Sequence, residues 1–452
     1  MAIAVGILLL VVITILFHFF SPWWFTPIAA DWASIDLTVD ITFWITGVVF
    51  IVLNGFLVWV IFVYRHRKGM KAHYEPESKK MEWWLTIVTT IGVVGLLAPG
   101  LWVWDRIISV PDDAAVVEVV GQQWHWSFRF PGEDGVLGQV EVARMTVDNP
   151  FGMKPDDPVG MDDVLVYSGE LHVPVGSPYK FVLRSKDVLH NFTVPQFRVK
   201  MDLIPGTTSY TWLTPTRTGR YDIMCEELCG IGHFAMRGVV VVDELTDFAT
   251  WLDGYPTFAE VLNTPAPDLA AGQNAYAMFC TTCHGANAEG NTMFNAPRLA
   301  GQETWYLKRQ VKNFQHGLRG ADSGDTYGLQ MAAMATLLAD DAAINNVAAY
   351  LASLATTDAP STISGDTDRG EHLFKTCKSC HGPNGEGIWA LNAPRLKGTD
   401  DWYLVRQLKN YKQGIRGSHP QDLYGKQMTL LTGMLRDEQD INDVVSYINT
   451  LQ

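Results

Sequence analysis

The chain has 452 residues, of which 48% are hydrophobic and only 18% are charged, and its formal net charge is −14. This length corresponds to about three domains. The acidic balance excludes a nucleic-acid-binding protein, because recognition of phosphates requires clustered Lys and Arg. The six cysteines fall into three close pairs, each beside a histidine, which favours metal or haem chemistry over a disulfide framework.

Three apolar stretches come first, at residues 2–20, 43–64 and 83–104. The second and third have the roughly 20 residues that a bilayer-spanning helix needs. The segment between the first and second stretches has no Lys or Arg, whereas the next segment carries Arg65, Arg67, Lys68, Lys71, Lys79 and Lys80. Because basic loops stay in the cytoplasm, residues 41–106 are predicted to form a membrane hairpin with everything after Trp104 outside.

The first stretch, residues 1–20, has two interpretations. It resembles a secretory signal, cleaved after Ala29 or Ala30, and it also resembles a first transmembrane helix. No positive charge precedes it, which favours a retained helix. The topology of the remaining chain is the same in both cases.

Residues 112–245 change to short runs rich in Val, Tyr, Phe and Thr, separated by Gly, Pro and Asp. The predicted strands are Ala115–Val120, Gln139–Val147, Asp163–Tyr167, Lys180–Leu183, Tyr210–Leu213 and Arg237–Val242. Many short strands with regular turn signals predict a β-sandwich or barrel.

A metal-binding pattern lies near the end of this region. Cys225, Cys229, His233 and Met236 fall within twelve residues, in a predicted loop between two strands, and His190 is the natural second imidazole. Sulfur ligands combined with imidazole select copper. A structural zinc site would leave Met236 without a role, and a mononuclear blue-copper site needs one cysteine rather than two. Buried cysteines without a metal are the third alternative.

The last part of the chain contains two C-x-x-C-H motifs, Cys280–His284 and Cys377–His381. This motif attaches haem c covalently, because the thiols form thioethers with the haem vinyl groups and the histidine binds the iron. A redox-active C-x-x-C is the alternative for a single motif. The motifs open a repeat with a constant offset, 377 − 280 = 97, which also relates Asn295–Leu299 to Asn392–Leu396.

The repeat selects the sixth iron ligand. Met331 and Met428 share the 97-residue offset, whereas Met334 would pair with Leu431; Met434 is a further candidate in the second unit. Thioether ligation raises the haem potential and favours electron transfer over oxygen binding. The closing segments Ala342–Leu354 and Gln439–Leu451 have helical periodicity. Residues 266–356 and 364–452 are therefore predicted to be two all-α haem units.

From about Phe43 to Asp243 the sequence resembles subunit II of haem-copper cytochrome c oxidases, here followed by a tandem dihaem cytochrome c. The resemblance is carried by Cys-x-Glu-x-Cys-x-x-x-His-x-x-Met and an upstream Asp-Val-x-His. It implies a multidomain protein with transmembrane helices, an all-β cupredoxin-like sandwich and two all-α cytochrome c domains. It also implies a binuclear copper A centre. Cys225 and Cys229 would bridge two coppers, with one histidine on each, and Met236 and the Glu227 carbonyl would complete them.

The resemblance implies further roles. The Glu227 side chain would reach a magnesium ion shared with subunit I, and the carbonyls of Pro297 and Pro394 would orient the haem histidines. Trp124 matches the tryptophan through which electrons enter, although the family usually has Tyr where His125 stands; a buried core aromatic is the alternative. Glu82 resembles a glutamate at the mouth of a proton channel, and a favourable charge near the helix dipole is the alternative.

The resemblance therefore implies the electron-accepting subunit of a proton-pumping respiratory terminal oxidase in the bacterial inner membrane, with copper and haem on the periplasmic side. Electrons would pass through both haems and copper A to the oxygen-reducing site in subunit I. The expected partners are subunits I and III, with quinol-cytochrome c reductase, a soluble cytochrome or a copper protein as electron donor. A nitric oxide reductase subunit and a free-standing electron carrier are the rival interpretations.

The sequence leaves the order of the two haems open. The unit nearer the copper domain in sequence is expected to be nearer in space. Residues 243–274 and 356–367 are predicted to be linkers, because they are rich in Pro, Asp, Ala, Ser and Thr.

Overall fold

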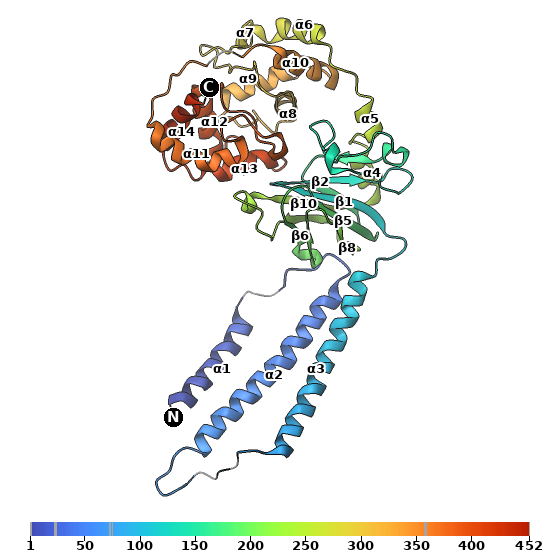
Figure 1. Ribbon diagram of the computed structural model, residues 1–452, viewed down its shortest axis with the longest axis vertical. Coiled ribbons are helices and arrows are strands. Elements are labelled where there is room, and N and C mark those ends of the chain that lie inside the picture. The colour runs from blue at the N-terminus through green and yellow to red at the C-terminus, as the bar shows by residue number, and fades with distance from the viewer. Residues whose placement is uncertain (1, 22–24, 72–73, 75, 357–358, 452) are drawn as a thin grey trace.

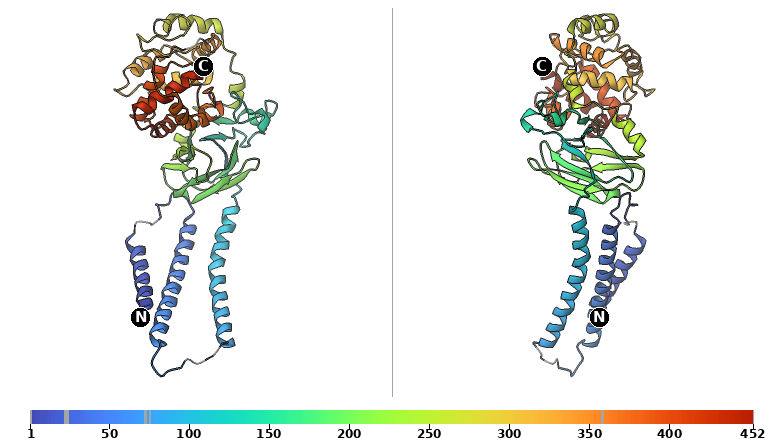
Figure 2. Two further views of the ribbon diagram at one scale, coloured as in Figure 1. Left: turned by 60° about the vertical axis from the view of Figure 1, so that its left-hand side comes forward. Right: turned by 90° about the vertical axis from the view of Figure 1, so that its right-hand side faces the viewer.

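The computed structural model describes residues 2–21, 25–71, 74, 76–356 and 359–451. Three long helices extend from one side of a β-sheet domain, and the helical haem units lie on its opposite side (Figure 1). The two turned views of Figure 2 show the same order of layers. The fold class predicted from the sequence is confirmed.

The long helices are α1 (Ala2–Phe20), α2 (Ala33–Val63) and α3 (Lys79–Ile108), and each is long and apolar enough to cross a membrane. Helix α2 begins ten residues before the predicted stretch. Thr38 and Thr42 bond the carbonyls four residues earlier, which satisfies their hydroxyls inside the helix. Asp36 also pairs with Arg198 of the β-domain at 2.6 Å, which fixes the early start.

The segment before α2 is attached to the β-domain. Ala30 forms a β-bridge with Pro215, and the Ala29 amide donates to the Gln196 carbonyl at 2.8 Å. The Trp32 indole donates to the Trp212 carbonyl at 3.1 Å. The predicted cleavage point therefore falls in a segment that pairs with the β-domain.

Two five-stranded sheets enclose the core, in the orders β3-β2-β1-β5-β8 and β4-β10-β9-β6-β7. The β1–β5 and β4–β10 pairs are parallel, and the remaining neighbours are antiparallel. Alternate side chains from the facing sheets, among them Phe128, Phe181 and Phe192, are fully buried between them. The strands are β1 (Ala115–Gln122), β2 (His125–Phe130), β3 (Val164–Val166), β4 (Glu170–Pro174), β5 (Tyr179–Ser185), β6 (His190–Val194), β7 (Val199–Leu203), β8 (Ser209–Leu213), β9 (Gly219–Met224) and β10 (Arg237–Asp243).

The predicted strand Gln139–Val147 is wrong. This segment holds the 3₁₀ helix η1 (Val142–Arg144), and Val142 is exposed rather than buried. The Asn149 side chain exchanges two hydrogen bonds with the backbone of Met153, at 2.8 and 2.9 Å. Within the segment, the Arg144 amide donates to the Glu141 carbonyl at 3.0 Å and the Met145 amide to the Val142 carbonyl at 3.1 Å. The backbone groups on both sides of residue 147 are therefore used in local turns rather than in a sheet.

The predicted linker after residue 243 is largely helical. It contains α4 (Leu245–Leu252) and α5 (Phe258–Leu262), which begins with a capping box at Thr257. Trp251 stacks on His172 with ring centroids 4.1 Å apart, and Phe258 is only 1% exposed. These aromatic side chains bind the segment to the sheets, so it extends the β-domain.

The first haem unit contains α6 (Leu269–Phe279), α7 (Thr281–His284), α8 (Thr304–Gln315), α9 (Thr326–Ala335) and α10 (Asp341–Ser353). The second contains α11 (Thr367–His381), η5 (Trp389–Leu391), α12 (Asp401–Lys412), α13 (Leu423–Thr432) and α14 (Glu438–Thr450). The helical prediction for both closing segments is confirmed by α10 and α14.

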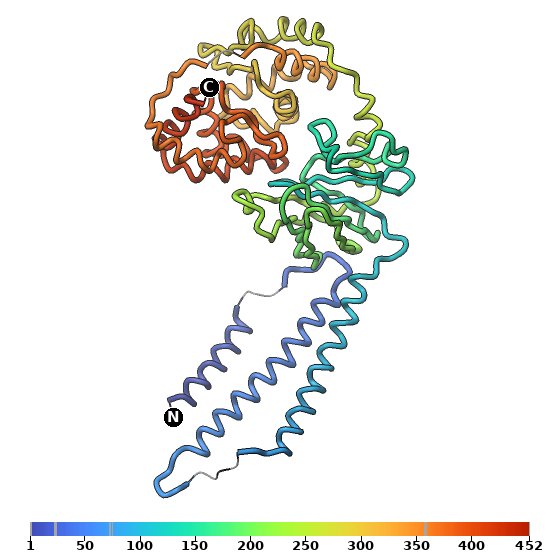
Figure 3. The backbone as a smooth tube through the Cα atoms, viewed as in Figure 1, coloured from blue at the N-terminus to red at the C-terminus, as the bar shows by residue number. Residues whose placement is uncertain are grey.

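The chain runs from the sheets to the first haem unit and then returns, so that the second unit lies beside the β-domain (Figure 3). Helix α13 contacts η4 (His233–Ala235) in the copper loop. The expectation that the first unit is nearer the copper loop is therefore wrong. Helices α4 and α5 carry the chain away from that loop before the first unit begins, which is the physical reason.

Candidate copper and haem sites

The predicted copper ligands converge in one loop. Strand β9 ends at Met224 and β10 begins at Arg237, so the loop between them carries both cysteines, His233 and Met236. His190 opens β6, which pairs with β9. The atoms of His190, Cys225 and Cys229 lie within 4.8 Å of one another, and all three residues are buried.

The spacing of these atoms suits metal binding. The two sulfur atoms lie 3.7 Å apart, Cys225 Sγ lies 3.9 Å from His190 Nδ1, and Cys229 Sγ lies 3.5 Å from His233 Nδ1. The Met236 sulfur is 3.8 Å from Cys229 Sγ, and the Glu227 carbonyl is 3.2 Å from Cys225 Sγ. Metal–ligand bonds of about 2.0–2.3 Å in a tetrahedral arrangement separate neighbouring ligand atoms by roughly 3.3–3.8 Å. The observed spacings lie close to this range, so the residues fit bound metal, and two sulfurs with imidazole and thioether suit copper.

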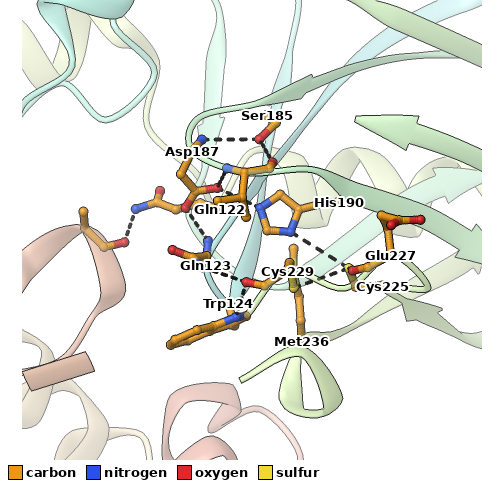
Figure 4. A network of polar contacts seen from close by, with 12 residues as sticks. Gln122, Gln123, Trp124, Ser185, Asp187, His190, Cys225, Glu227, Cys229 and Met236 are labelled. Atoms are coloured by element: carbon orange, nitrogen blue, oxygen red, sulfur yellow. Dashed lines mark hydrogen bonds and ion pairs between the residues drawn. The ribbon is translucent and has the colours of Figure 1, made fainter. Parts of the chain in front are cut away.

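The surroundings prepare these ligands chemically. The close contact with the Cys229 side chain lowers the pKa of Cys225 and favours its thiolate. Asp187 Oδ1 lies 2.8 Å from His190 Nε2, so that nitrogen carries the proton and Nδ1 faces the cysteines. Figure 4 shows His190, Cys225, Cys229 and Met236 directed toward one another.

Trp124 lies directly against the copper loop. Its indole nitrogen donates to the Cys229 carbonyl at 2.9 Å, and the Gln123 amide donates to the same oxygen at 2.7 Å. A Cβ at Gly232 would lie 2.4 Å from the indole ring, so only glycine fits there. Trp124 is 4% exposed, so it is a buried core aromatic that also touches the copper loop, and its role in electron entry stays a prediction.

The second haem unit covers this side of the loop. The Gln427 side chain donates to the Trp124 carbonyl, and the Gln122 side chain donates to the Ala390 carbonyl. Asn392 Nδ2 lies 3.3 Å from both ring nitrogens of His125. Tyr424 packs edge-on against that ring at 5.6 Å. These contacts could not be predicted from the sequence, in which the unusual His125 is the one signal of them.

Both haem motifs are arranged in the same way. His284 Nδ1 lies 2.7 Å from the Pro297 carbonyl, and His381 Nδ1 lies 2.7 Å from the Pro394 carbonyl. Each Nδ1 therefore donates its proton and leaves Nε2 for iron. Burial lowers the pKa of both histidines, which favours the neutral form that binds metal.

A cavity in the first unit is lined by Cys280, Cys283, His284 and both methionine candidates, Met331 and Met334. The second unit contributes part of its wall through Tyr403, Arg406 and Gln407. The lining joins both thiols, the histidine and a thioether to an apolar pocket, which fits haem c. Met428 lies at the equivalent place in α13.

The two haem units meet through a quasi-symmetric network. Arg319 donates to Gln310 of its own unit at 2.7 Å and to Tyr403 of the other unit at 2.7 Å. The residues 97 positions later repeat the pattern, since Arg416 donates to Gln407 at 2.7 Å and to Tyr306 at 3.2 Å. The same offset relates the Arg309–Asn392 and Arg406–Asn295 contacts.

Glu82 lies in the first turn of α3 and is exposed. This position suits both its predicted role at a proton channel and a favourable interaction with the helix dipole.

The domains of this chain match known protein families. Residues 115–243 match the periplasmic domain of cytochrome c oxidase subunit II, and residues 269–355 and 367–452 each match cytochrome c. The chain is 51% identical over 259 residues to the alternative cytochrome c oxidase subunit 2 of Bradyrhizobium diazoefficiens, covering 57% of this chain and 94% of that protein. The chain belongs to the cytochrome c oxidase subunit 2 family.

Two further similarities each cover part of the chain. It is 38% identical over 136 residues to cytochrome c oxidase subunit 2 of Thermostichus vulcanus, covering 30% of this chain and 32% of that protein. Reduced cytochrome c4 from Pseudomonas stutzeri matches with 29% identity and a TM-score of 0.34, covering 41% of this chain and all of that one.

This membership establishes an electron-transfer role in a haem-copper oxidase, with subunit I as partner and the sheet domain on the periplasmic side of a membrane. Copper A and haem c follow from the two families. The individual ligands stay predictions, which two substitutions test.

In Cys229→Ser, we expect loss of both coppers of the binuclear centre, because a hydroxyl is a poor soft ligand and cannot bridge the metals. Copper content per chain and the electron paramagnetic resonance signal of the pair are the measurements. Leu228→Ala, an exposed neighbour (77%) in the same loop, is the control and should keep both. Unchanged copper content in Cys229→Ser would remove that residue as a ligand.

In Met331→Leu, we expect haem to stay attached through Cys280 and Cys283 while its spectrum changes and its potential falls, because the thioether ligand is lost. Redox titration of the purified protein measures both. The matched control is Met334→Leu, which should leave both unchanged. If only Met334→Leu changes the spectrum and the potential, Met334 rather than Met331 is the sixth iron ligand.

Proposed function

We propose that this subunit receives electrons at the first haem unit and delivers them through the second unit to copper A, from which they reach the oxygen-reducing site in subunit I. The oxidase would be a proton-pumping enzyme of the bacterial inner membrane. The observation that carries this order is the seating of the second unit on Trp124 and His125, directly behind the Cys229 carbonyl.

The contacts support a short path from the second unit to the copper ligands. Leu391 packs against the hydrophobic core that contains both copper-loop cysteines, and Cys380 belongs to that core. Leu423 presses against Gly169, where a Cβ would lie 2.0 Å from Leu423 Cδ1. Holding the two modules on one chain raises their effective concentration to the millimolar range for short linkers.

The predicted ligand set belongs to this proposal. Copper A would use His190, Cys225, Glu227 through its carbonyl, Cys229, His233 and Met236. Two haems would use Cys280, Cys283, His284 and Met331, and Cys377, Cys380, His381 and Met428. Bound there, these groups supply reversible one-electron storage, while the chain orients each imidazole and excludes water. Trp124 would lie on the electron path.

Other parts of the proposal concern partners. Glu227 is half-buried at the loop surface beside Leu228, which is 77% exposed. An exposed apolar side chain next to a carboxylate suits an interface with subunit I that shares a magnesium ion. Glu82 at the cytoplasmic start of α3 would take part in proton uptake. Subunit III is a further proposed partner, and the electron donor is proposed to be quinol-cytochrome c reductase, a soluble cytochrome or a copper protein.

The experiment that tests this function is a haem inventory of the membrane complex purified through this chain. Alkaline pyridine separates haem c from haem a and haem b spectroscopically. We expect two haems c per chain together with non-covalent haem that includes the a type. Haem b without haem a would favour a nitric oxide reductase or an oxidase lacking haem a, and haem c alone would favour a free electron carrier.

The proposed order is tested with Ala390→Asp, which adds a carboxylate where the second unit meets Gln122. Burying an unpaired polar group costs roughly 1–3 kcal/mol or more, and each 1.4 kcal/mol lowers the docked population about tenfold. We expect slower reduction of copper A by the haems, followed by stopped-flow spectroscopy, while reduction of the haems themselves is unchanged. If copper A is reduced at the same rate in Ala390→Asp and in the unsubstituted oxidase, the proposed order of electron transfer is contradicted.

A further inference from the structure

Among the residues through which the second unit contacts the copper domain, four lie on η5 and α13. Ala390 accepts a hydrogen bond from Gln122, Leu391 packs against the copper-domain core, Tyr424 packs on His125, and Gln427 donates to the Trp124 carbonyl. We call these four residues the second-unit surface. It is the face through which this unit meets its redox partner within the chain.

The 97-residue repeat places an equivalent face on the first unit. Its members, called the first-unit surface, are Met293, Phe294, Tyr327 and Gln330. The two loops fold alike: isolated β-bridges close them at Asn291–Ala296 and Ile388–Ala393, and Asn295 and Asn392 have φ of 54° and 52°. The correspondence is therefore structural as well as sequential.

The first-unit surface and the second-unit surface differ in solvent exposure. The four second-unit residues are partly buried, whereas Met293 is 84% exposed, Phe294 48% and Tyr327 41%. Met293 replaces the small Ala390, so the exposed face is more apolar than the covered one. An exposed cluster of large apolar side chains on a soluble module marks an interaction site.

The first-unit surface also borders the haem cavity. Phe294, Tyr327 and Gln330 line that cavity together with Cys280, Cys283 and His284. A protein seated on this surface would therefore lie beside the rim of the first haem pocket. None of the four side chains is charged, and the Arg406 guanidinium of the second unit lies 4.5 Å from the Tyr327 ring. Apolar burial would therefore hold most of the partner, with one cation at the edge of the surface.

We propose that the first-unit surface is the docking site of the external electron donor, a soluble one-electron carrier protein with an apolar face around its redox centre. The copper domain shows what such a surface accepts, because it offers the second-unit surface the ring of His125 and the backbone carbonyl of Trp124. The inference rests on the proposed electron order and adds the site at which the partner binds.

The test is Met293→Asp in the complete oxidase, with a reduced soluble monohaem cytochrome c as the probe. We expect kcat/KM for oxygen consumption with this cytochrome to fall about tenfold or more, because a charge enters the centre of an apolar contact. Consumption driven by a small diffusible reductant should stay unchanged. Leu269→Asp, an exposed leucine (49%) at the far end of α6, is the matched control and should change kcat/KM less than about twofold.

Ala390→Asp provides the complementary measurement, because it occupies the equivalent position of the second unit. It should slow the transfer from haem to copper A and leave capture of the cytochrome intact, whereas Met293→Asp should do the reverse. Equal kcat/KM in Met293→Asp and the unsubstituted oxidase would overturn the docking site. An unsubstituted oxidase that accepts electrons from the small reductant but not from the cytochrome would also overturn it.

Two further outcomes distinguish a failure of the proposed electron order from a failure of the proposed docking site. If the cytochrome reduces copper A before either haem, the proposed electron order itself fails. If the haems are reduced first and Met293→Asp has no effect, the order stands and the docking surface fails. Loss of self-association in Met293→Asp, with an unchanged rate, would show instead that a second copy of the chain covers this surface.

Discussion

The carbonyl oxygen of Cys229 accepts hydrogen bonds from both Trp124 and Gln123, and this shared acceptor joins the copper loop to the end of β1 and the start of β2. The loop keeps its shape because its backbone is held from outside. The same turn presents Trp124 and His125 to the second haem unit. The geometry of the ligands and the seating of the haem unit therefore depend on one set of bonds.

The docked second unit changes what Trp124 and His125 can contact. Trp124 is buried beneath a covalently connected module, so an external carrier cannot reach it while the second unit is docked. The family usually has Tyr at the position of His125, and here burial lowers the pKa of this imidazole to about 3. A neutral ring suits a contact with Asn392 and Tyr424, because it brings no charge into the interface.

Much of the site could be predicted because its residues are close in sequence. The copper ligands lie mostly in one loop, and each haem motif is five residues long, so their chemistry was visible before any fold. The 97-residue offset likewise indicated which methionines correspond. Helices α10 and α14 followed from periodicity, and β10 from its run of valines.

Other features depended on contacts between distant residues. The contact between the second unit and the copper domain could not be predicted from the sequence. Ala390, Tyr424 and Gln427 form no motif, and they reach the copper domain only because the chain folds back on it. The strand expected at residues 139–147 failed because backbone groups there form the local turn η1 instead of pairing with a sheet. The segment expected to be a linker forms α4 and α5 instead. Its isolated aromatic residues, such as Phe258, pack into the core of the β-domain, and the local sequence pattern does not indicate this packing.

The shared wall of the first haem cavity has a consequence for biosynthesis. Tyr403, Arg406 and Gln407 belong to the second unit, yet they line the cavity that contains Cys280 and His284. During synthesis the first unit, taken without the second, would have a cavity with one side missing. Tyr403, Arg406 and Gln407 complete its wall, so a haem attached through Cys280 and Cys283 would be shielded from water on that side only after α12 has folded against it.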